Sequence, residues 1–255
     1  MKIFKRIGII IFLVILLLVI LHIADSYMWP KPNIYDDSYF SWEGGRVVYS
    51  GPNGENAMFG IDVSSHNGYI DWKKLKKQGV DFAFIRVGYR GYTKRKINQD
   101  KMFHYNIKEA QKARIKVGVY FFSQSININE AKEEAQFTIK NISSYNISMP
   151  VVYDMEEMPQ DPARVDSLTD SQRTDCALTF INTVEFNGYE TMIYGNKKWL
   201  SYKFEPERIG KKNLWLASYN DRPGYPYRFK AWQYTEKGRL KGIKGNVDFN
   251  IWLPD

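Results

Sequence analysis

Eight short apolar runs recur through residues 59–250, and they constrain the fold of this chain more than any other feature. Many of their residues are β-branched or aromatic, as is typical of strands. The runs are "FGIDVS" (59–64), "FAFIRVG" (82–88), "KVGVYFFS" (116–123), "PVVYDME" (150–156), "ETMIYGN" (190–196), "LWLASY" (214–219), "FKAWQYT" (229–235) and "NVDFN" (246–250). Helical patterns fill the intervals between the first five runs. Strands that alternate with helices predict a parallel sheet covered on both faces.

The last three intervals are too short for a crossover helix, which needs about a dozen residues or more. We therefore predict an α/β fold, an irregular TIM-like barrel of five βα units plus three closing strands joined by plain loops. Side chains at the C-terminal ends of barrel strands face the active site in this architecture. A catalytic barrel is accordingly expected over residues 58–255.

The N-terminus differs in composition from the rest of the chain. Lys2, Lys5 and Arg6 precede an apolar run over residues 7–24. This length falls within the ~17 to 25 residues that span a bilayer and exceeds the ~7 to 15 of a signal-peptide core. Residues 1–24 are therefore expected to form one transmembrane signal anchor, with everything after it outside the cytoplasm. No convincing cleavage site follows, although release by cleavage is left open.

Residues 25–57 are rich in Pro, Gly and aromatic residues and show no clear periodicity. This composition predicts a spacer between the anchor and the barrel. Its aromatic side chains are too apolar for a wholly disordered segment. Part of the spacer is therefore expected to pack on the barrel.

Acidic side chains lie at the ends of three predicted strands. Asp154 and Glu156 are two residues apart, so in a strand they point to the same side with backbones ~6.6 Å apart. Asp62 and Asp248 come from the first and last strands, which are neighbours in a closed barrel. Two close carboxylates repel, and one of them can relieve this by keeping its proton. A protonated acid beside an ionised carboxylate is what glycosidic bond cleavage requires.

A buried structural network is the alternative interpretation of these acids, with Arg86 or a lysine as the partner. The number of acids in excess of such partners favours catalysis. Glu157 is expected to point away from the pair or to begin the following loop.

Polar and aromatic side chains at the same strand ends fit a sugar site, because Tyr and Trp faces stack on sugar rings while their polar tips form hydrogen bonds. The predicted substrate-binding residues are Arg86, Tyr89, Tyr120, Tyr194, Tyr219, Trp232 and Gln233. Trp232 and Tyr194 are preferred because each lies beside a polar residue at a strand end. Packing in the core is the alternative for each aromatic residue.

Other chemistries lack their usual motifs. The three histidines do not have the spacing of metal ligands, and no phosphate-binding glycine loop is present, so no metal or cofactor is expected. His66 could line the rim of the site or be incidental. Cys176 fits a small buried helix residue better than a nucleophile. The net charge of +8 predicts a solvated surface or contact with an anionic polymer or lipid, and no motif accompanies it that would indicate nucleic acid.

The motifs "GIDVSSHNGYIDW", "FAFIRVGYRG", "GVYFFSQS", "PVVYDMEE", "MIYGN", "LWLASY", "AWQYT" and "VDFN", in this order, resemble glycoside hydrolase family 25. This family comprises lysozymes that act as N-acetylmuramidases on bacterial peptidoglycan. The likeness extends over residues 59–252. It implies a β/α barrel and hydrolysis of the β-1,4 bond between N-acetylmuramic acid and N-acetylglucosamine.

The resemblance also assigns roles by motif. Glu156 resembles the general acid, and Asp154 resembles the partner that orients the acetamido group or stabilises charge. Asp62 and Asp248 resemble the flanking acids. Together with the anchor predicted from residues 7–24, these roles indicate a muramidase that is held in the bacterial cell membrane and breaks down or remodels the wall locally. A chitinase-like hydrolase of N-acetylglucosamine polymers and a non-catalytic glycan-binding protein are the alternatives. The oligomeric state is not indicated.

Overall fold

A computed structural model of the protein describes residues 7, 10–20, 30–91, 95–157 and 164–254. Residues 10–20 are helical and exposed. Within the described ranges no helix combines the length and the apolar character needed to cross a membrane. Parts of the predicted anchor, residues 8–9 and 21–24, lie outside the described residues.

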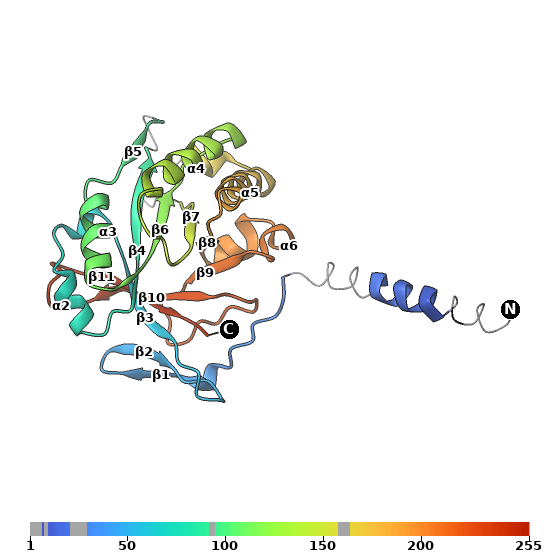
Figure 1. Cartoon of the computed structure of the whole chain (residues 1–255), viewed down its shortest axis with the longest axis horizontal. Helices are drawn as coiled ribbons and strands as arrows, with labels where there is room; N and C mark the ends of the chain where they lie inside the picture. The colour runs from blue at the N-terminus through green and yellow to red at the C-terminus, as the bar shows by residue number, and fades with distance from the viewer. Residues whose placement is uncertain (1–6, 8–9, 21–29, 92–94, 158–163, 255) are drawn as a thin grey trace.

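A closed barrel of eight strands dominates the described part of the chain (Figure 1). All eight predicted strands form in it. In spatial order they are β3 (Met58–Val63), β4 (Phe82–Arg90), β6 (Lys116–Phe122), β7 (Val151–Asp154), β8 (Thr191–Asn196), β9 (Asn213–Ala217), β10 (Ala231–Gly238) and β11 (Val247–Trp252). The short strand β5 (Ile97–Gln99) pairs with the end of β4 outside the ring. The pairing of β3 with β4 closes the barrel.

The last strand differs in direction from the other strands of the ring. Strands β3 to β10 of the ring run parallel, whereas β11 is antiparallel to both of its neighbours, β10 and β3. The physical reason is the short connection of residues 239–246, which permits a hairpin but not a crossover. One consequence is that Asp248 lies directly opposite Asp62 in the register of β11 with β3.

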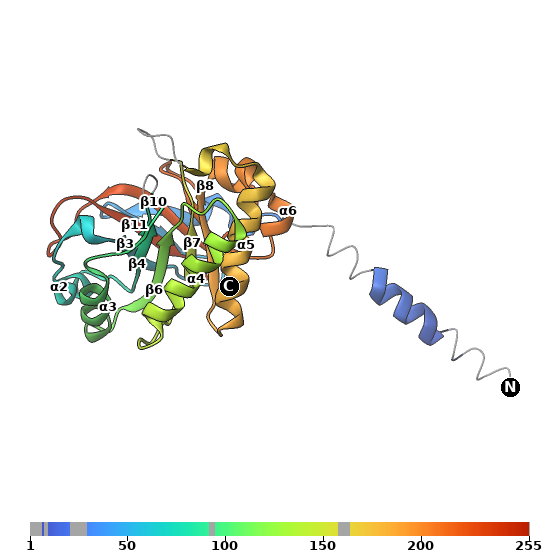
Figure 2. The same ribbon diagram turned by 90° about the horizontal axis from the view of Figure 1, so that it is seen from above.

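Four helices connect the first five strands of the barrel, β3 to β8, and lie along one side of it (Figure 2). They are α2 (Trp72–Lys77), α3 (Phe103–Lys112), α4 (Ile128–Ile142) and α5 (Asp170–Phe186). The side chains of Asp71, Asn127 and Thr169 cap the N-termini of α2, α4 and α5, so local sequence signals set these helix starts. Short 3₁₀ turns are η1 (Asp37–Tyr39), η2 (Ser65–Asn67) and η3 (Arg164–Ser167).

The interval after β8 was expected to be too short for a crossover helix, and this expectation is wrong, whereas the fifth predicted βα unit is present. It contains a π-helical turn, η4 (Trp199–Lys203), and the short helix α6 (Pro206–Ile209). Trp199 and Leu200 are buried, so apolar anchoring on the barrel explains the turns. The last two intervals have no named helix in the described residues, as expected.

Apolar side chains fill two layers. One cluster, which includes Phe82, Phe84 and Trp215, fills the barrel, and a larger cluster lies between the strands and the surrounding elements. Gly60 and Gly118 permit the inner packing, since a Cβ at either position would overlap the ring of Phe82 or Phe84. These glycines therefore serve close approach of backbone and ring.

Residues 30–57 pack on the barrel and contain a hairpin of β1 (Phe40–Glu43) and β2 (Arg46–Tyr49). The hydroxyl of Tyr35 donates to the carbonyl of Pro254 at 2.8 Å, and the guanidinium of Arg46 donates to the carbonyl of Gln78 at 2.7 Å. The ring of Phe40 packs edge-on against Trp232 at 5.5 Å between centroids. This part of the predicted spacer is thus an ordered addition to the barrel wall.

Candidate active site

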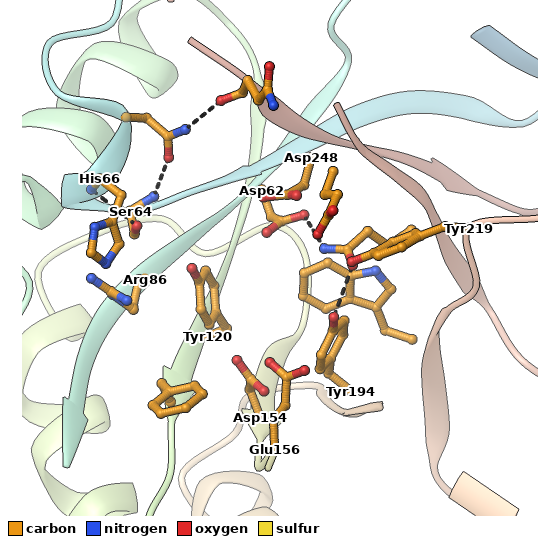
Figure 3. Close-up of a pocket in the computed structure, with 16 residues that line it drawn as sticks. Asp62, Ser64, His66, Arg86, Tyr120, Asp154, Glu156, Tyr194, Tyr219 and Asp248 are labelled. Carbon is orange, nitrogen blue, oxygen red and sulfur yellow. Dashed lines mark hydrogen bonds between the residues drawn. The ribbon is translucent and has the colours of Figure 1, made fainter. Parts of the chain in front are cut away.

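A cavity of about 600 Å³ opens where the parallel strands end (Figure 3). Nine of the predicted site residues line it, namely Asp62, Arg86, Tyr120, Asp154, Glu156, Tyr194, Tyr219, Gln233 and Asp248. They come from all eight barrel strands or from the residues just beyond them. Asp248 lies near the N-terminal end of antiparallel β11, which reaches the same rim as the C-terminal ends of the parallel strands, where the active site of a barrel enzyme is expected.

Asp154 and Glu156 form an acid pair in this cavity (Figure 3). Asp154 is the last residue of β7 and only 5% exposed, whereas Glu156 lies two residues further out and is partly exposed. The side-chain amide of Gln124 donates to the backbone carbonyl of Glu156 at 3.3 Å and holds this segment. Among the described residues, Oδ1 of Asp154 is buried with no hydrogen-bond partner. An unpartnered acceptor aimed into a cavity is suited to a substrate donor.

The environment favours the protonated forms of this pair. Burial, and next the negative charge of Glu156, raises the pKa of Asp154 well above its usual range. Burial also raises the pKa of Glu156 to about 7. The pair therefore keeps at least one proton near neutral pH, which a general acid requires.

Asp62 and Asp248 form a second acid pair across the cavity, joined by the cross-strand register of β3 and β11. Burial raises the pKa of Asp62 to about 6. Burial, and next the charge of Asp62, raises the pKa of Asp248 to about 8. Here too, like charges held close together share a proton near neutral pH.

Two buried amides orient Asp62. The side-chain NH₂ groups of Gln233 and Asn250 each donate to Oδ2 of Asp62 at 2.8 Å. These hydrogen bonds favour the ionised carboxylate and oppose the effect of burial on its pKa.

Aromatic donors fix those amides in turn. The hydroxyls of Tyr194 and Tyr219 donate to Oε1 of Gln233 at 2.9 and 2.8 Å, and the indole N–H of Trp215 donates to Oδ1 of Asn250 at 2.8 Å. Both amide oxygens are thus occupied, so only the NH₂ groups can face Asp62. The aromatic side chains that line the cavity also set its hydrogen-bond directions.

Arg86 does not neutralise either acid pair directly. Its Nε donates to Oδ2 of Asp100 at 2.9 Å, and a terminal nitrogen donates to Oγ of Ser65 at 3.3 Å. The structural network considered as an alternative therefore joins Arg86 to Asp100, and the acids of the two pairs form no ion pair with a described Lys or Arg. Glu157 is directed elsewhere and pairs with Lys198 and Lys203 on the surface.

The structure does not place Trp232 in the cavity, which corrects its assignment as a sugar contact. Its ring is fully buried on the outer side of β10, and its indole N–H donates to the carbonyl of Ser218 at 2.7 Å. The reason is strand alternation, because the adjacent Gln233 faces inward. Trp215 lines the cavity instead, and its spacing of four residues from Tyr219 was the signal that could have identified it.

Tyr89 is also absent from the cavity lining. A bulge between Arg86 and Gly88 shifts the register of β4 with β6, so the alternation of side chains changes before Tyr89. The ring of Tyr89 lies 5.2 Å from the guanidinium carbon of Arg86 and packs on that side chain. Its position fits support of Arg86 rather than contact with a ligand.

Several lining residues were not predicted as site residues, namely Ser64, Asn67, Phe122, Trp215, Glu236 and Asn246, and His66 joins them at the rim. Four of these seven lie on loops or in the η2 turn, where sequence periodicity gives no signal. Ser64 and Asn67 form a capping box that fixes the η2 turn beside the cavity. Among the described residues no group of three or more His, Cys, Asp or Glu side chains is arranged to hold a metal ion.

Comparisons with known proteins agree with this geometry. The model of the glycosyl hydrolases family 25 matches residues 61–243. Lysozyme M1 of Streptomyces globisporus is 27% identical over 209 residues, which cover 78% of this chain and 69% of that protein. The lysozyme of Streptococcus phage Cp-1 is 27% identical over 203 residues, covering 74% of this chain and 54% of the phage protein.

Among solved structures, the modular autolysin LytC from Streptococcus pneumoniae in complex with a synthetic peptidoglycan ligand superposes with a TM-score of 0.69 at 29% identity. The match covers 84% of this chain and 52% of the autolysin. The chain thus spans about half the length of the autolysin and of the phage lysozyme.

Proposed function

Because this chain belongs to family 25 of the glycosyl hydrolases, we propose that it is a 1,4-β-N-acetylmuramidase that hydrolyses peptidoglycan strands. The observation that carries the proposal is the pair of buried Asp154 and partly exposed Glu156 at the mouth of the barrel, both with raised pKa values. The lysozymes among its relatives and the peptidoglycan ligand of the similar autolysin support this choice of substrate.

Glu156 is the proposed general acid. It lies further out than Asp154 and is partly exposed, so it can reach the glycosidic oxygen of a bound strand. A pKa of about 7 allows it to hold a proton at neutral pH and to release it as the bond breaks. The proton goes to the oxygen that leaves with N-acetylglucosamine, while positive charge develops on C1 of N-acetylmuramic acid.

Asp154 is the proposed partner of the substrate's acetamido group. Its buried Oδ1 has no described protein donor and can accept the acetamido N–H. This contact would orient the acetamido oxygen to attack C1 and would stabilise the positive charge of the cyclic intermediate. Water then opens the intermediate with net retention, and Glu156 serves as the base.

Digestion of purified peptidoglycan by the full chain tests the proposed bond. The products are reduced with borohydride and analysed by mass spectrometry. We expect every new reducing end to be N-acetylmuramic acid, because C1 of this sugar is freed when its β-1,4 bond is hydrolysed. New ends on N-acetylglucosamine, or turnover of chitin at a comparable rate, would contradict the proposal and favour a different hexosaminidase.

We also propose that the enzyme is held in the bacterial cell membrane with its barrel outside the cytoplasm. This proposal is supported by the sequence of the N-terminus, where Lys2, Lys5 and Arg6 precede the apolar residues 7–24. Peptidoglycan also lies on the outer side of that membrane, so the proposed substrate requires this orientation.

A reporter fused after the C-terminal residue tests the orientation. A phosphatase that folds only outside the cytoplasm should be active in this position, and the fusion should sediment with membranes. Activity of a cytoplasm-only reporter in the same place would contradict the orientation, and a fully released, shortened chain would show cleavage in place of anchoring.

A further inference from the structure

The active-site cavity continues into two smaller hollows toward the N-terminal hairpin. The first, of about 510 Å³, shares Glu156, Tyr194, Tyr219 and Glu236 with the cavity. The second, of about 230 Å³, shares Tyr219, Asn220 and Glu236 with the first. Since neighbouring hollows share walls, a chain-like ligand in the cavity can extend from one hollow to the next.

Trp42 forms part of the wall of the last hollow and comes from strand β1. This strand precedes residues 61–243, so the family match does not include it. The side chain is 44% exposed, although its hairpin is anchored to the barrel through buried Phe40. The indole ring of Trp42 is therefore partly exposed on a hairpin that packs against the barrel.

Trp42 contacts a residue of the strand that also carries a cavity residue. Its ring contacts Tyr234 edge-to-face, with centroids 5.6 Å apart and an interplanar angle of 89°. Tyr234 is buried in β10 directly after Gln233, whose amide orients Asp62. Tyr234 thus links Trp42 to the strand that carries Gln233.

The lining of the last hollow combines aromatic surface with hydrogen-bonding groups. Trp42 and the half-exposed Tyr219 supply the aromatic surface, and Asn220, Asp221, Thr235, Glu236 and Lys237 supply donors and acceptors. Aromatic faces with polar groups around them suit a sugar ring. Two acids against one lysine favour a neutral N-acetylglucosamine unit over a group with a free negative charge, such as a peptide carboxylate, a lipid phosphate or the lactyl group of N-acetylmuramic acid.

We propose that this hollow is a further subsite, in which Trp42 stacks on an outlying sugar unit of the glycan strand bound in the catalytic cavity. The inference rests on the proposed function and names a contact outside the matched residues. Its consequence is a preference for longer strands, because only these can occupy the cavity and reach Trp42 together.

Binding of peptide-free glycan strands of increasing length tests the subsite in the full chain. Affinities are measured for Glu156→Gln, which prevents turnover, and for the same chain with Trp42→Ala. In Glu156→Gln we expect the affinity to rise with strand length. In the chain that also carries Trp42→Ala, the affinity for the longest strands should be about tenfold lower, equivalent to ~1.4 kcal/mol. The shortest strands should bind both proteins equally.

Two further variants separate stacking from folding. Trp42→Tyr keeps an aromatic face and should retain most of the length-dependent gain. Phe186→Ala removes a ring that is 92% exposed at the end of α5, and it should bind strands of every length as the parent does. Thermal unfolding of each variant reports any loss of hairpin packing.

Three results would overturn the inference. The first is that Trp42→Ala leaves all affinities unchanged, and the second is that it reduces them by the same factor at every length. The third is that, when strands that still carry peptides are measured as well, Trp42→Ala weakens the binding of these alone, in which case the hollow binds the peptide. Absence of glycan binding at any length would contradict the proposed function as well, and is thereby distinguishable from failure of the subsite alone.

Discussion

Glu156→Gln is expected to lower the turnover of peptidoglycan by about 10²- to 10⁴-fold, the range in which one general acid contributes. The amide has nearly the same shape as the carboxylic acid but cannot release a proton to the glycosidic oxygen. The measurement is the initial rate of new reducing ends on purified peptidoglycan. Since binding does not depend on the proton, the affinity for glycan strands should change far less than the rate.

A folding defect must be excluded as the cause of that loss. The folded-state pKa of Glu156, about 7, lies above its ordinary value of 4.5. The stability contribution of this group is therefore complete below pH 4.5 and is lost as the pH rises through 7, because ionisation in a buried site is costly. Glu156→Gln should match the wild-type Tm near pH 4 and equal or exceed it near pH 8.

Glu157→Gln is the matched control for this experiment. Glu157 is the adjacent residue, but its side chain is exposed and pairs with Lys198 and Lys203. Exposed ion pairs contribute about 0 to 1 kcal/mol, so this variant should retain nearly all activity and stability. Wild-type turnover by Glu156→Gln, or an equal loss in Glu157→Gln, would refute the assignment of the general acid.

Asp154→Asn is the second change with a large expected effect, a loss of about 10²-fold or more in kcat, on the scale of one lost electrostatic contact in a transition state. The negative charge that Asp154 carries when Glu156 holds the shared proton is removed, while the side chain keeps its size. Asp154 is buried at the end of β7, so little replacement by water is available. Rates are compared on the same peptidoglycan across a range of pH.

The pH profile of Asp154→Asn adds a test of coupling. In the wild type the hydrogen bond to Asp154 lowers the pKa of Glu156, against the effect of burial. Asparagine cannot share a proton with Glu156, so the two groups no longer titrate as a pair. The alkaline limb of the residual activity should therefore move from its wild-type position, and an unchanged profile would show that the two groups titrate independently.

The catalytic strand is the part of the site that could be read most directly from residues. "PVVYDME" combines a β-branched run with two acids at a spacing of two, and both acids line the cavity. The opposition of Asp62 and Asp248 also followed from barrel closure, because the first and last strands of a closed sheet must meet. Asn250 was missed, since its role depends on a contact with Asp62 across 188 positions of sequence.

Trp232 was predicted to line the cavity, but Trp215 lines it instead. Both residues lie in apolar strands, and both are buried. In an α/β barrel the strands are covered by side chains on their inner and outer faces, so hydrophobic pattern does not distinguish the two. Trp215 points into the barrel and Trp232 points toward the N-terminal hairpin.

The sequence by itself determined the number and order of the barrel strands and the acids at their ends, because strand runs and side-chain alternation are local properties of the chain. Only the tertiary structure decided which face of each strand points inward, which amides hold Asp62, and that Trp42 lines a hollow near the cavity. These features depend on contacts between segments far apart in the chain, which strand closure and hairpin packing bring together.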